Sequence, residues 1–183
     1  MAADSQLAFA RAVRAYERGR FAWAATFAFP LGALAVLACC LGTRVGLAVS
    51  VGTTLVATAW VFLWRGQTLG RAVFPGVVAG LVPLALAFGA RSVGHVCTGS
   101  ECVSLCVPAC TAGGLVAGVV IARAGRHASS QLRFYGGASA LAVLVGALGC
   151  SCVGFGGVAG LGLGLLLTMG PVLIRRRVAS GNS

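Results

Sequence analysis

The sequence contains no lysine and very few acidic residues or histidines. Its 14 basic residues are all arginine, and against them stand 3 acidic residues, Asp4, Glu17 and Glu101, and 2 histidines. Charged residues make up 9% of the chain and hydrophobic residues 58%, which is far from the composition of a soluble globular domain. Such an apolar chain needs lipid as its solvent. The composition therefore predicts an integral membrane protein whose first partner is the lipid bilayer.

The scarcity of acidic and imidazole groups also argues against catalysis. The C-x-x-C motif of thiol oxidoreductases is absent, and the Cys150-Ser151-Cys152 pair is a rarer redox arrangement. His95, Ser100, Glu101 and Ser104 lie near one another, but no residue is placed as the orienting member of a triad. No carboxylate or histidine falls within a long apolar run, as a proton-coupled carrier needs. We therefore expect that the protein is not an enzyme.

The net charge of +11 raises the question of nucleic acid. A nucleic-acid interface places basic side chains in a continuous patch, with aromatic residues among them. Here the arginines stand in short groups between long apolar runs, a distribution that suits anionic lipid headgroups and membrane topology. We expect no nucleic-acid partner.

Six apolar runs without a charged residue follow one another along the chain, at about 23–42, 45–64, 72–90, 103–122, 134–151 and 156–174. Roughly 20 residues of helix cross the ~30 Å of a bilayer core. The last two runs form one uncharged stretch from Phe134 to Ile174, nearly twice the length of one crossing, so a turn must interrupt it, and Gly149 to Gly154 supplies the glycines. The sequence predicts an all-α, polytopic membrane bundle of six transmembrane helices.

The arginines set the orientation of these spans. With the N-terminus in the cytoplasm, only Arg44 and Arg91 lie outside, and twelve arginines lie inside: Arg11, Arg14, Arg18, Arg20, Arg65, Arg71, Arg123, Arg126, Arg133, Arg175, Arg176 and Arg177. This bias puts both termini in the cytoplasm of a bacterial inner membrane. The predicted parts are a cytoplasmic segment 1–22, a transmembrane domain 23–174 with an outer cysteine-rich loop 91–110, and a basic tail 175–183.

The cytoplasmic segment has the pattern of a short amphipathic helix. Phe9, Val13 and Tyr16 recur at helical spacing on one face, and the other face carries Arg11, Arg14 and Arg18. Such a helix either lies on the inner leaflet or docks a cytoplasmic protein. These six residues are the candidate partner-binding residues.

All eight cysteines fall on the outer side of the predicted topology. Cys39 and Cys40 end the first span, Cys97, Cys102, Cys106 and Cys110 precede or enter the fourth, and Cys150 and Cys152 lie at the last outer turn. Outer thiols meet an oxidising compartment, so one interpretation is a set of disulfides that staples the helix ends together. The other is a site that works through its thiols.

A working thiol site depends on where the fourth helix begins. If it begins near Glu101, Cys102, Cys106 and Cys110 form a stripe on one face, to which His95 and the cysteines of the last turn can converge. If Pro108 is the first helical residue, the stripe dissolves. Thiolates with one imidazole suit Zn(II), Cu(I) or Hg(II), although the C-x2-C pairs typical of structural zinc sites are absent. His95 alone is more often a solvated loop residue than a metal ligand.

The layout resembles that of the NrsF-like membrane anti-sigma factors. It shares a short cytoplasmic N-terminal segment, six spans, and outer cysteines before the fourth span and at the last outer turn, although Gly149-Cys150-Ser151 stands where that family has His-Cys-Pro. The resemblance implies that one of Cys97 to Cys106 acts with Cys150 or Cys152 in sensing metal or oxidative stress. It also implies that cytoplasmic parts bind a sigma factor.

A second resemblance covers the first span only. Cys39-Cys40 looks like the vicinal cysteine pair in the first helix of the bacterial mercury-transport proteins, although such a pair also arises from small apolar helix residues. The sequence thus leaves three hypotheses. The leading one is a redox- or metal-responsive regulator of a cytoplasmic partner, and the others are a carrier of mercury- or copper-type ions and a disulfide-stapled structural membrane protein.

Overall fold

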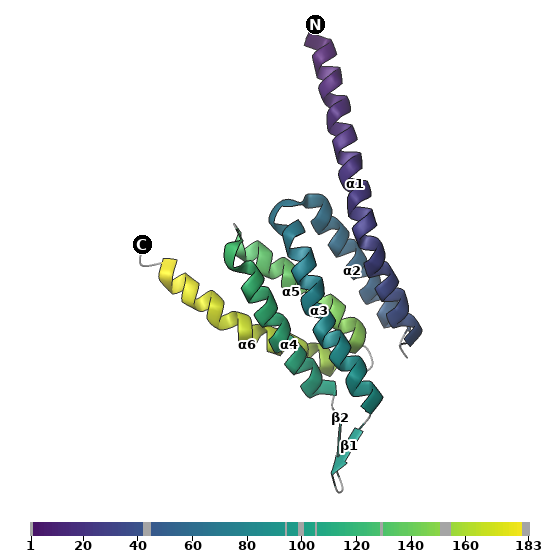
Figure 1. Ribbon diagram of the computed structural model, residues 1–183, viewed down its shortest axis with the longest axis vertical. Helices are drawn as coiled ribbons and strands as arrows, with labels where there is room; N and C mark the ends of the chain where they lie inside the picture. Colours follow the sequence, from purple (N-terminus) through teal and green to yellow (C-terminus); the bar gives the residue numbers. More distant parts are fainter. Residues whose placement is uncertain are drawn as a thin grey trace.

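The computed structural model describes residues 2–41, 45–93, 95–98, 101–104, 106–128, 130–150 and 155–180; side chains are described for most of them, but not for the strands or beyond Pro171. This part of the chain is a helical bundle with one short hairpin (Figure 1), composed in order of α1 (Ala2–Leu41), α2 (Val45–Arg65), α3 (Gln67–Val93), β1 (His95–Thr98), β2 (Glu101–Ser104), α4 (Cys106–Ala124), the 3-10 turn η1 (Gly125–His127), α5 (Gln131–Cys150) and α6 (Phe155–Ser180).

The predicted all-helical bundle is confirmed, and six helices stand where six apolar runs are found in the sequence. The uncharged stretch from Phe134 is interrupted as expected, because α5 ends at Cys150 and α6 begins at Phe155. Four helices contain segments long and apolar enough to cross a membrane: Phe9–Cys40, Val45–Arg65, Thr68–Ala90 and Gln131–Gly149. The apolar segments Pro108–Ala124 and Gly157–Pro171 are shorter.

The centre of the bundle is α3, which packs against α5 and α4, while α6 packs on α4 and α1 on α2. Glycines make these crossings close, at sequence spacings such as Gly76-x3-Gly80 and Gly114-x3-Gly118. A Cβ at Gly80 would come within 2.6 Å of Val145 on α5, and one at Gly114 within 2.5 Å of the Leu161 carbonyl oxygen on α6. Such approaches bring backbones into contact without large side chains between them. Leu141 and Leu161 fill the core beside these glycines and are fully buried.

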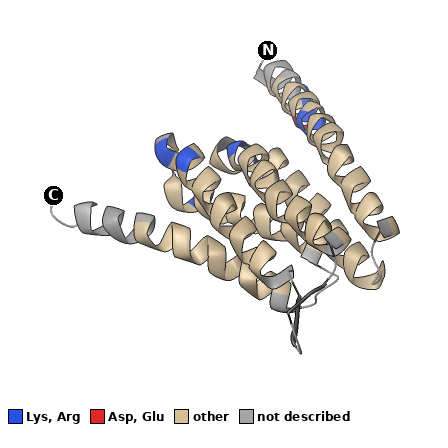
Figure 2. Cartoon of the chain, turned by 60° about the horizontal axis from the view of Figure 1, so that its bottom comes forward, with Lys and Arg blue, Asp and Glu red and all other residues tan. Residues whose placement is uncertain are grey.

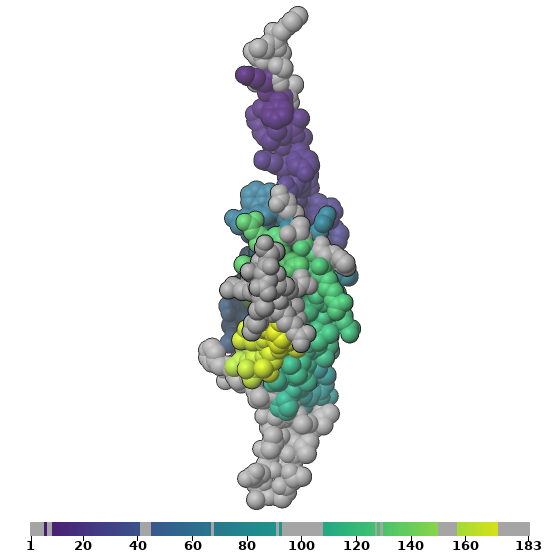
Figure 3. All heavy atoms as spheres, turned by 90° about the vertical axis from the view of Figure 1, so that its left-hand side faces the viewer, coloured from purple at the N-terminus to yellow at the C-terminus, as the bar shows by residue number. Residues whose placement is uncertain are grey.

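The first helix differs from the prediction. A short amphipathic helix was expected ahead of the first span, but α1 is one helix of 40 residues, about 60 Å long. Its N-terminal half stands clear of the bundle as a single column (Figures 1 and 3). Pro30 lies inside this helix and does not begin it. Because α1 is continuous, Cys39, Cys40 and the predicted partner-binding face belong to one helix.

The charges of the bundle are segregated. The described arginines, on α1, near the α2–α3 connection and near the α4–α5 connection, lie toward one end of the molecule (Figure 2). The hairpin β1–β2 extends from the other end (Figure 1), and the C-terminal end of α1 with Cys39 and Cys40 points the same way. The fold therefore has a basic end and a cysteine-bearing end.

Candidate functional site

The hairpin that holds two of the cysteines is absent from the sequence prediction, which expects a loop there. β1 and β2 pair antiparallel in the register His95 with Ser104, Val96 with Val103, Cys97 with Cys102 and Thr98 with Glu101. Two residues, Gly99 and Ser100, separate the strands in the sequence. Residues of high β-propensity on both sides of Gly-Ser are a hairpin signal that could have revealed it.

The register places His95, Cys97 and Cys102 on one face of the hairpin. Successive residues of a strand alternate between faces, so the pairs His95–Ser104 and Cys97–Cys102 share one face, and the Val96–Val103 pair lies on the other. Paired Cα atoms of an antiparallel ladder lie about 4.5–5.5 Å apart, a range that permits a disulfide.

The residue at which the fourth helix begins determines whether the predicted cysteine stripe forms. α4 begins at Cys106, so Pro108 lies in its first turn, where a missing N–H costs no intrahelical hydrogen bond. Cys102 belongs to β2. The stripe of Cys102, Cys106 and Cys110 therefore does not form, and only Cys106 and Cys110 remain four residues apart on the helix.

Cys110 is a structural cysteine in this fold. It is fully buried, disulfide-bonded, and clustered with Ala87 of α3 and Val158 of α6. Gly149, near the end of α5, packs against the same Ala87. A Cβ added at Gly149 would lie 3.2 Å from the Cβ of Ala87. The helix ends that carry Cys110 and Cys150 therefore meet the same part of α3. The sulfur of Cys110 is therefore not free to bind a metal ion. Cys152 lies outside the described residues.

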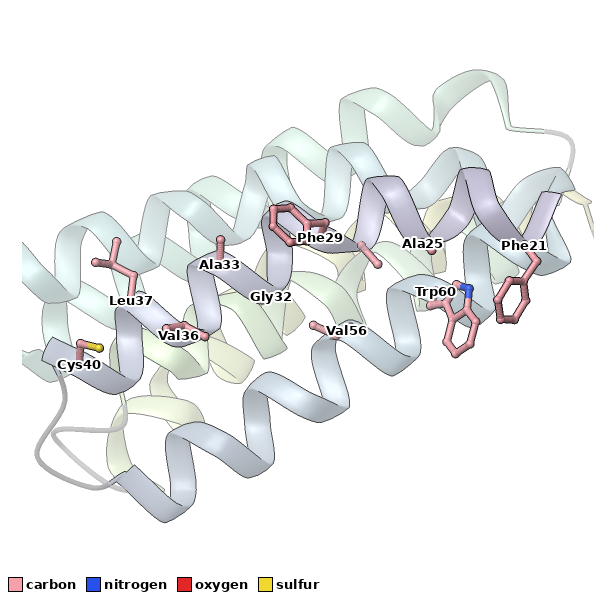
Figure 4. A pocket seen from close by; sticks show the side chains of 11 residues that line it. Phe21, Ala25, Phe29, Gly32, Ala33, Val36, Leu37, Cys40, Val56 and Trp60 are labelled. Atoms are coloured by element: carbon pink, nitrogen blue, oxygen red, sulfur yellow. The ribbon is translucent and has the colours of Figure 1, made fainter. Parts of the chain in front are cut away.

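Cys39 and Cys40 are free thiols at the end of α1. Cys40 lies at one end of an apolar groove of about 830 Å³ between α1 and α2, whose far end is formed by Phe21 and Trp60 (Figure 4). The rings of Phe21 and Trp60 pack edge to face, with their centroids 4.6 Å apart. Cys39 borders a neighbouring groove beside Gly52 of α2. These two thiols border grooves lined by α1 and α2, whereas Cys110 packs on α3 and α6, so the structure does not bring them into one site.

The metal hypothesis rests on the hairpin. Among the described side chains, no group of three or more histidine, cysteine, aspartate or glutamate residues lies close enough to hold a metal ion. The side chains of the strands, of Cys106 and of Cys150 are not among the described side chains. The proximity of His95, Cys97 and Cys102 is therefore argued from the backbone register alone.

The candidate partner-binding residues all lie on the projecting half of α1. Phe9 and Tyr16 are 72% and 66% exposed and Val13 is 38% exposed. Arg11, Arg14 and Arg18 are exposed as well. No described side chain of the bundle covers this face, which is free for a partner of matching chemistry.

Two arginines have a role that the sequence does not reveal. Arg20 donates a hydrogen bond to the backbone carbonyl of Trp64 at the end of α2, and its guanidinium lies 5.7 Å from the centre of the Tyr16 ring. Arg20 and Arg65 border the same pocket. The sequence assigns both only to the positive inner side, because the contact joins residues 44 positions apart.

The fold and the site define a class: an α-helical bundle with several apolar helices of membrane-spanning length and a hairpin that bears a histidine and two cysteines on one face. Comparison of the chain with models of protein families, with curated proteins and with solved structures finds no match.

Proposed function

We propose that the chain crosses a bacterial inner membrane six times, with both termini in the cytoplasm, and regulates a cytoplasmic partner in response to its outer thiols. The observation that carries the proposal is that the described arginines lie at the end of the bundle opposite the hairpin, whose strands contain Cys97 and Cys102 (Figures 1 and 2). The positive-inside bias assigns the basic end to the cytoplasm. The hairpin then faces the oxidising compartment.

The lengths of the two helices with the shorter apolar segments, α4 and α6, support six crossings. α4 has 19 residues and α6 has 26, so at ~1.5 Å per residue they are about 28 and 39 Å long, against ~30 Å of hydrocarbon. The last turns of α6 include Arg175, Arg176 and Arg177. These arginines fit the headgroup region at the cytoplasmic surface.

The outer site would sense oxidation or a soft metal through one set of groups. His95, Cys97 and Cys102 share a face of the hairpin by register, and the Cys97-x4-Cys102 spacing lies within the range of zinc ligand pairs. Reduced thiols bind Zn(II), Cu(I) or Hg(II). Oxidation joins the two sulfurs and removes them as ligands.

The inner output would be the projecting half of α1. Its exposed apolar residues, flanked by arginines, suit a partner helix with an acidic rim. The resemblance to the anti-sigma factors makes a sigma factor the first partner to test. α1 also carries Cys39 and Cys40 at its other end, so a change in packing at the outer end can reach the inner half through one continuous helix.

The test uses the full chain in lipid nanodiscs, starting from the reduced protein. One sample receives glutathione disulfide, which accepts two electrons and two protons from two protein thiols and leaves as two glutathione thiols, while the protein sulfurs form a disulfide. Another receives Co(II) as a coloured probe for Zn(II). Hydrogen exchange of the peptide covering residues 9–20 is measured in each state. A sensor changes the exchange of this peptide, and the Cys97→Ser/Cys102→Ser variant loses the change.

Cys40→Ser is the matched control, because it removes a free thiol at the same end of the bundle and should leave the response intact. The sensor is contradicted if hydrogen exchange of this peptide in the wild type stays unchanged although the thiols are oxidised or the Co(II) thiolate absorption is present. That result supports a disulfide-stapled scaffold.

The carrier hypothesis finds less support in the structure. The groove beside Cys40 is lined by apolar side chains such as Phe29, Ala33 and Val36, which offer a soft ion no ligand on its way inward. Uptake of Hg(II) into proteoliposomes that depends on both Cys39 and Cys40 would favour the carrier over the sensor.

A further inference from the structure

A polar pocket opens at the basic end of the bundle, where α1 passes the C-terminal end of α2. It has a volume of about 460 Å³ and is lined by Tyr16, Arg20 and Trp23 of α1 and by Leu63, Arg65 and Gly66. Two of these six residues are cationic and none is acidic. The pocket therefore carries a concentrated positive charge without a carboxylate of its own.

The geometry holds one of these cations in place. Arg20 is half-buried, donates to the Trp64 carbonyl and lies over the Tyr16 ring. A guanidinium has five N–H donors in a planar fork, so the contact with Trp64 leaves donors for an anion. Arg65 is exposed and able to close on the same anion from the other helix. Bidentate arginine contacts of this kind recognise phosphate.

An apolar groove continues from this pocket. It has a similar volume, about 460 Å³, shares Trp23 and Leu63 with the pocket, and runs between α1 and α3. Its walls extend from Trp23 to Leu34 on α1 and from Gly70 to Leu81 on α3. Each wall spans eleven residue steps, about 16 Å of helix, which matches half of the ~30 Å hydrocarbon core. The groove thus has the length of an acyl chain in one leaflet.

We propose that the pocket and groove together bind one anionic phospholipid. Its phosphate lies between Arg20 and Arg65, and an acyl chain lies along the groove past Phe27 and Val73. Charge complementarity selects the headgroup, since basic pockets between transmembrane helices bind anionic lipid. Trp23, where the polar pocket meets the apolar groove, occupies the depth that tryptophan prefers at a membrane interface. This site is separate from the proposed thiol sensor.

The test titrates the delipidated full-length protein in detergent with phosphatidylglycerol or with phosphatidylcholine of the same acyl chains, and native mass spectrometry measures the bound fraction. Phosphatidylglycerol should bind more tightly. Arg65→Gln should weaken its binding about tenfold and leave phosphatidylcholine unchanged. Arg65→Lys keeps the charge and should retain most of the affinity. Arg133→Gln removes the same charge from an exposed position on α5 and should have little effect.

A second variant tests the groove. A Cβ at Gly70 would meet only the Phe62 carbonyl oxygen, at an ordinary 3.5 Å, so Gly70→Leu fits the fold and fills the groove. It should weaken diacyl phosphatidylglycerol severalfold. Circular dichroism and size-exclusion profiles establish that each variant is folded. Three results would overturn the proposal: equal binding of both lipids, equal loss in Arg65→Gln and Arg133→Gln, or displacement of phosphatidylglycerol by millimolar inorganic phosphate, which would define a free-anion site.

Discussion

Gly66 is the residue on which the connection between α2 and α3 depends. It has a φ of +64°, in the left-handed region. Its N–H donates a hydrogen bond to the carbonyl oxygen of Phe62, with an N–O distance of 3.0 Å. Its own carbonyl accepts from Gly70 at 3.1 Å, so α3 begins at once. This single residue turns the chain back at the basic end and places Arg65 beside Arg20.

Replacing Gly66 tests that role. Gly66→Ala should lower the free energy of unfolding by about 1 kcal/mol, because a Cβ is unfavourable in the left-handed region. Gly66→Asn should cost less, since asparagine tolerates this conformation. Thermal unfolding in detergent, followed by circular dichroism, measures both. An alanine variant at least as stable as the wild type would show that the turn relaxes to another conformation.

At the scale of elements, close helix crossings hold the bundle together. α4 crosses α6 where Gly114 faces Gly164. A Cβ at Gly114 would come within 3.2 Å of the Gly164 Cα, and a Cβ at Gly164 within 2.5 Å of the Thr111 carbonyl oxygen. Either methyl group must push the same two backbones apart.

This shared contact predicts a coupled effect. Gly114→Ala and Gly164→Ala should each destabilise the bundle by about 1–3 kcal/mol through overpacking. The double variant should lose less than the sum, because the first substitution has already separated the helices. Gly162→Ala, whose Cβ meets nothing within 4 Å, is the control on the same helix. Strict additivity in chemical denaturation would mean that the two sites do not share one crossing.

The hairpin shows why sequence patterns predict elements unequally. Each long helix has a hydrophobic run of about 20 residues, which is a strong signal. β1 and β2 have four residues each, too few for periodicity to distinguish a strand from a loop. The start of α4 at Cys106 depends on where this hairpin ends, and so the cysteine stripe could not be settled from spacing.

At the scale of the whole molecule, α1 links the two ends and extends beyond the bundle. Phe9 and Tyr16 stay exposed on the projecting half, and the first buried residue among the described side chains of α1 is Ala24. The projecting half therefore contributes little to the stability of the bundle. Its exposed surface is available for a partner.

Deleting residues 2–15 separates these roles, and it retains Tyr16 and Arg20 for the lipid pocket. The free energy of unfolding should change by less than about 0.5 kcal/mol, as for surface changes. Binding of the sigma factor that the resemblance implies should be lost. Unfolding in detergent and co-purification from membranes measure the two effects. Phe9→Ala/Val13→Ala is the milder companion variant, and unchanged co-purification of the sigma factor with both would contradict the proposed docking face.

The sequence by itself determined the helical bundle and its six apolar runs, and it predicts the side of the membrane on which each group of arginines and cysteines falls. These properties follow from hydrophobicity and charge along the chain, which act locally. Glycines spaced four residues apart also favour close helix crossings, and Gly80 and Gly114 lie at such crossings.

Only the tertiary structure decided which residues meet. The pairing of Cys97 with Cys102 depends on strand register, and the burial of Cys110 on the way α3, α4 and α6 converge. The joint pocket of Arg20 and Arg65 exists because a left-handed Gly66 brings the end of α2 beneath α1. Contacts between residues tens of positions apart depend on helix crossing and packing, which no local pattern encodes.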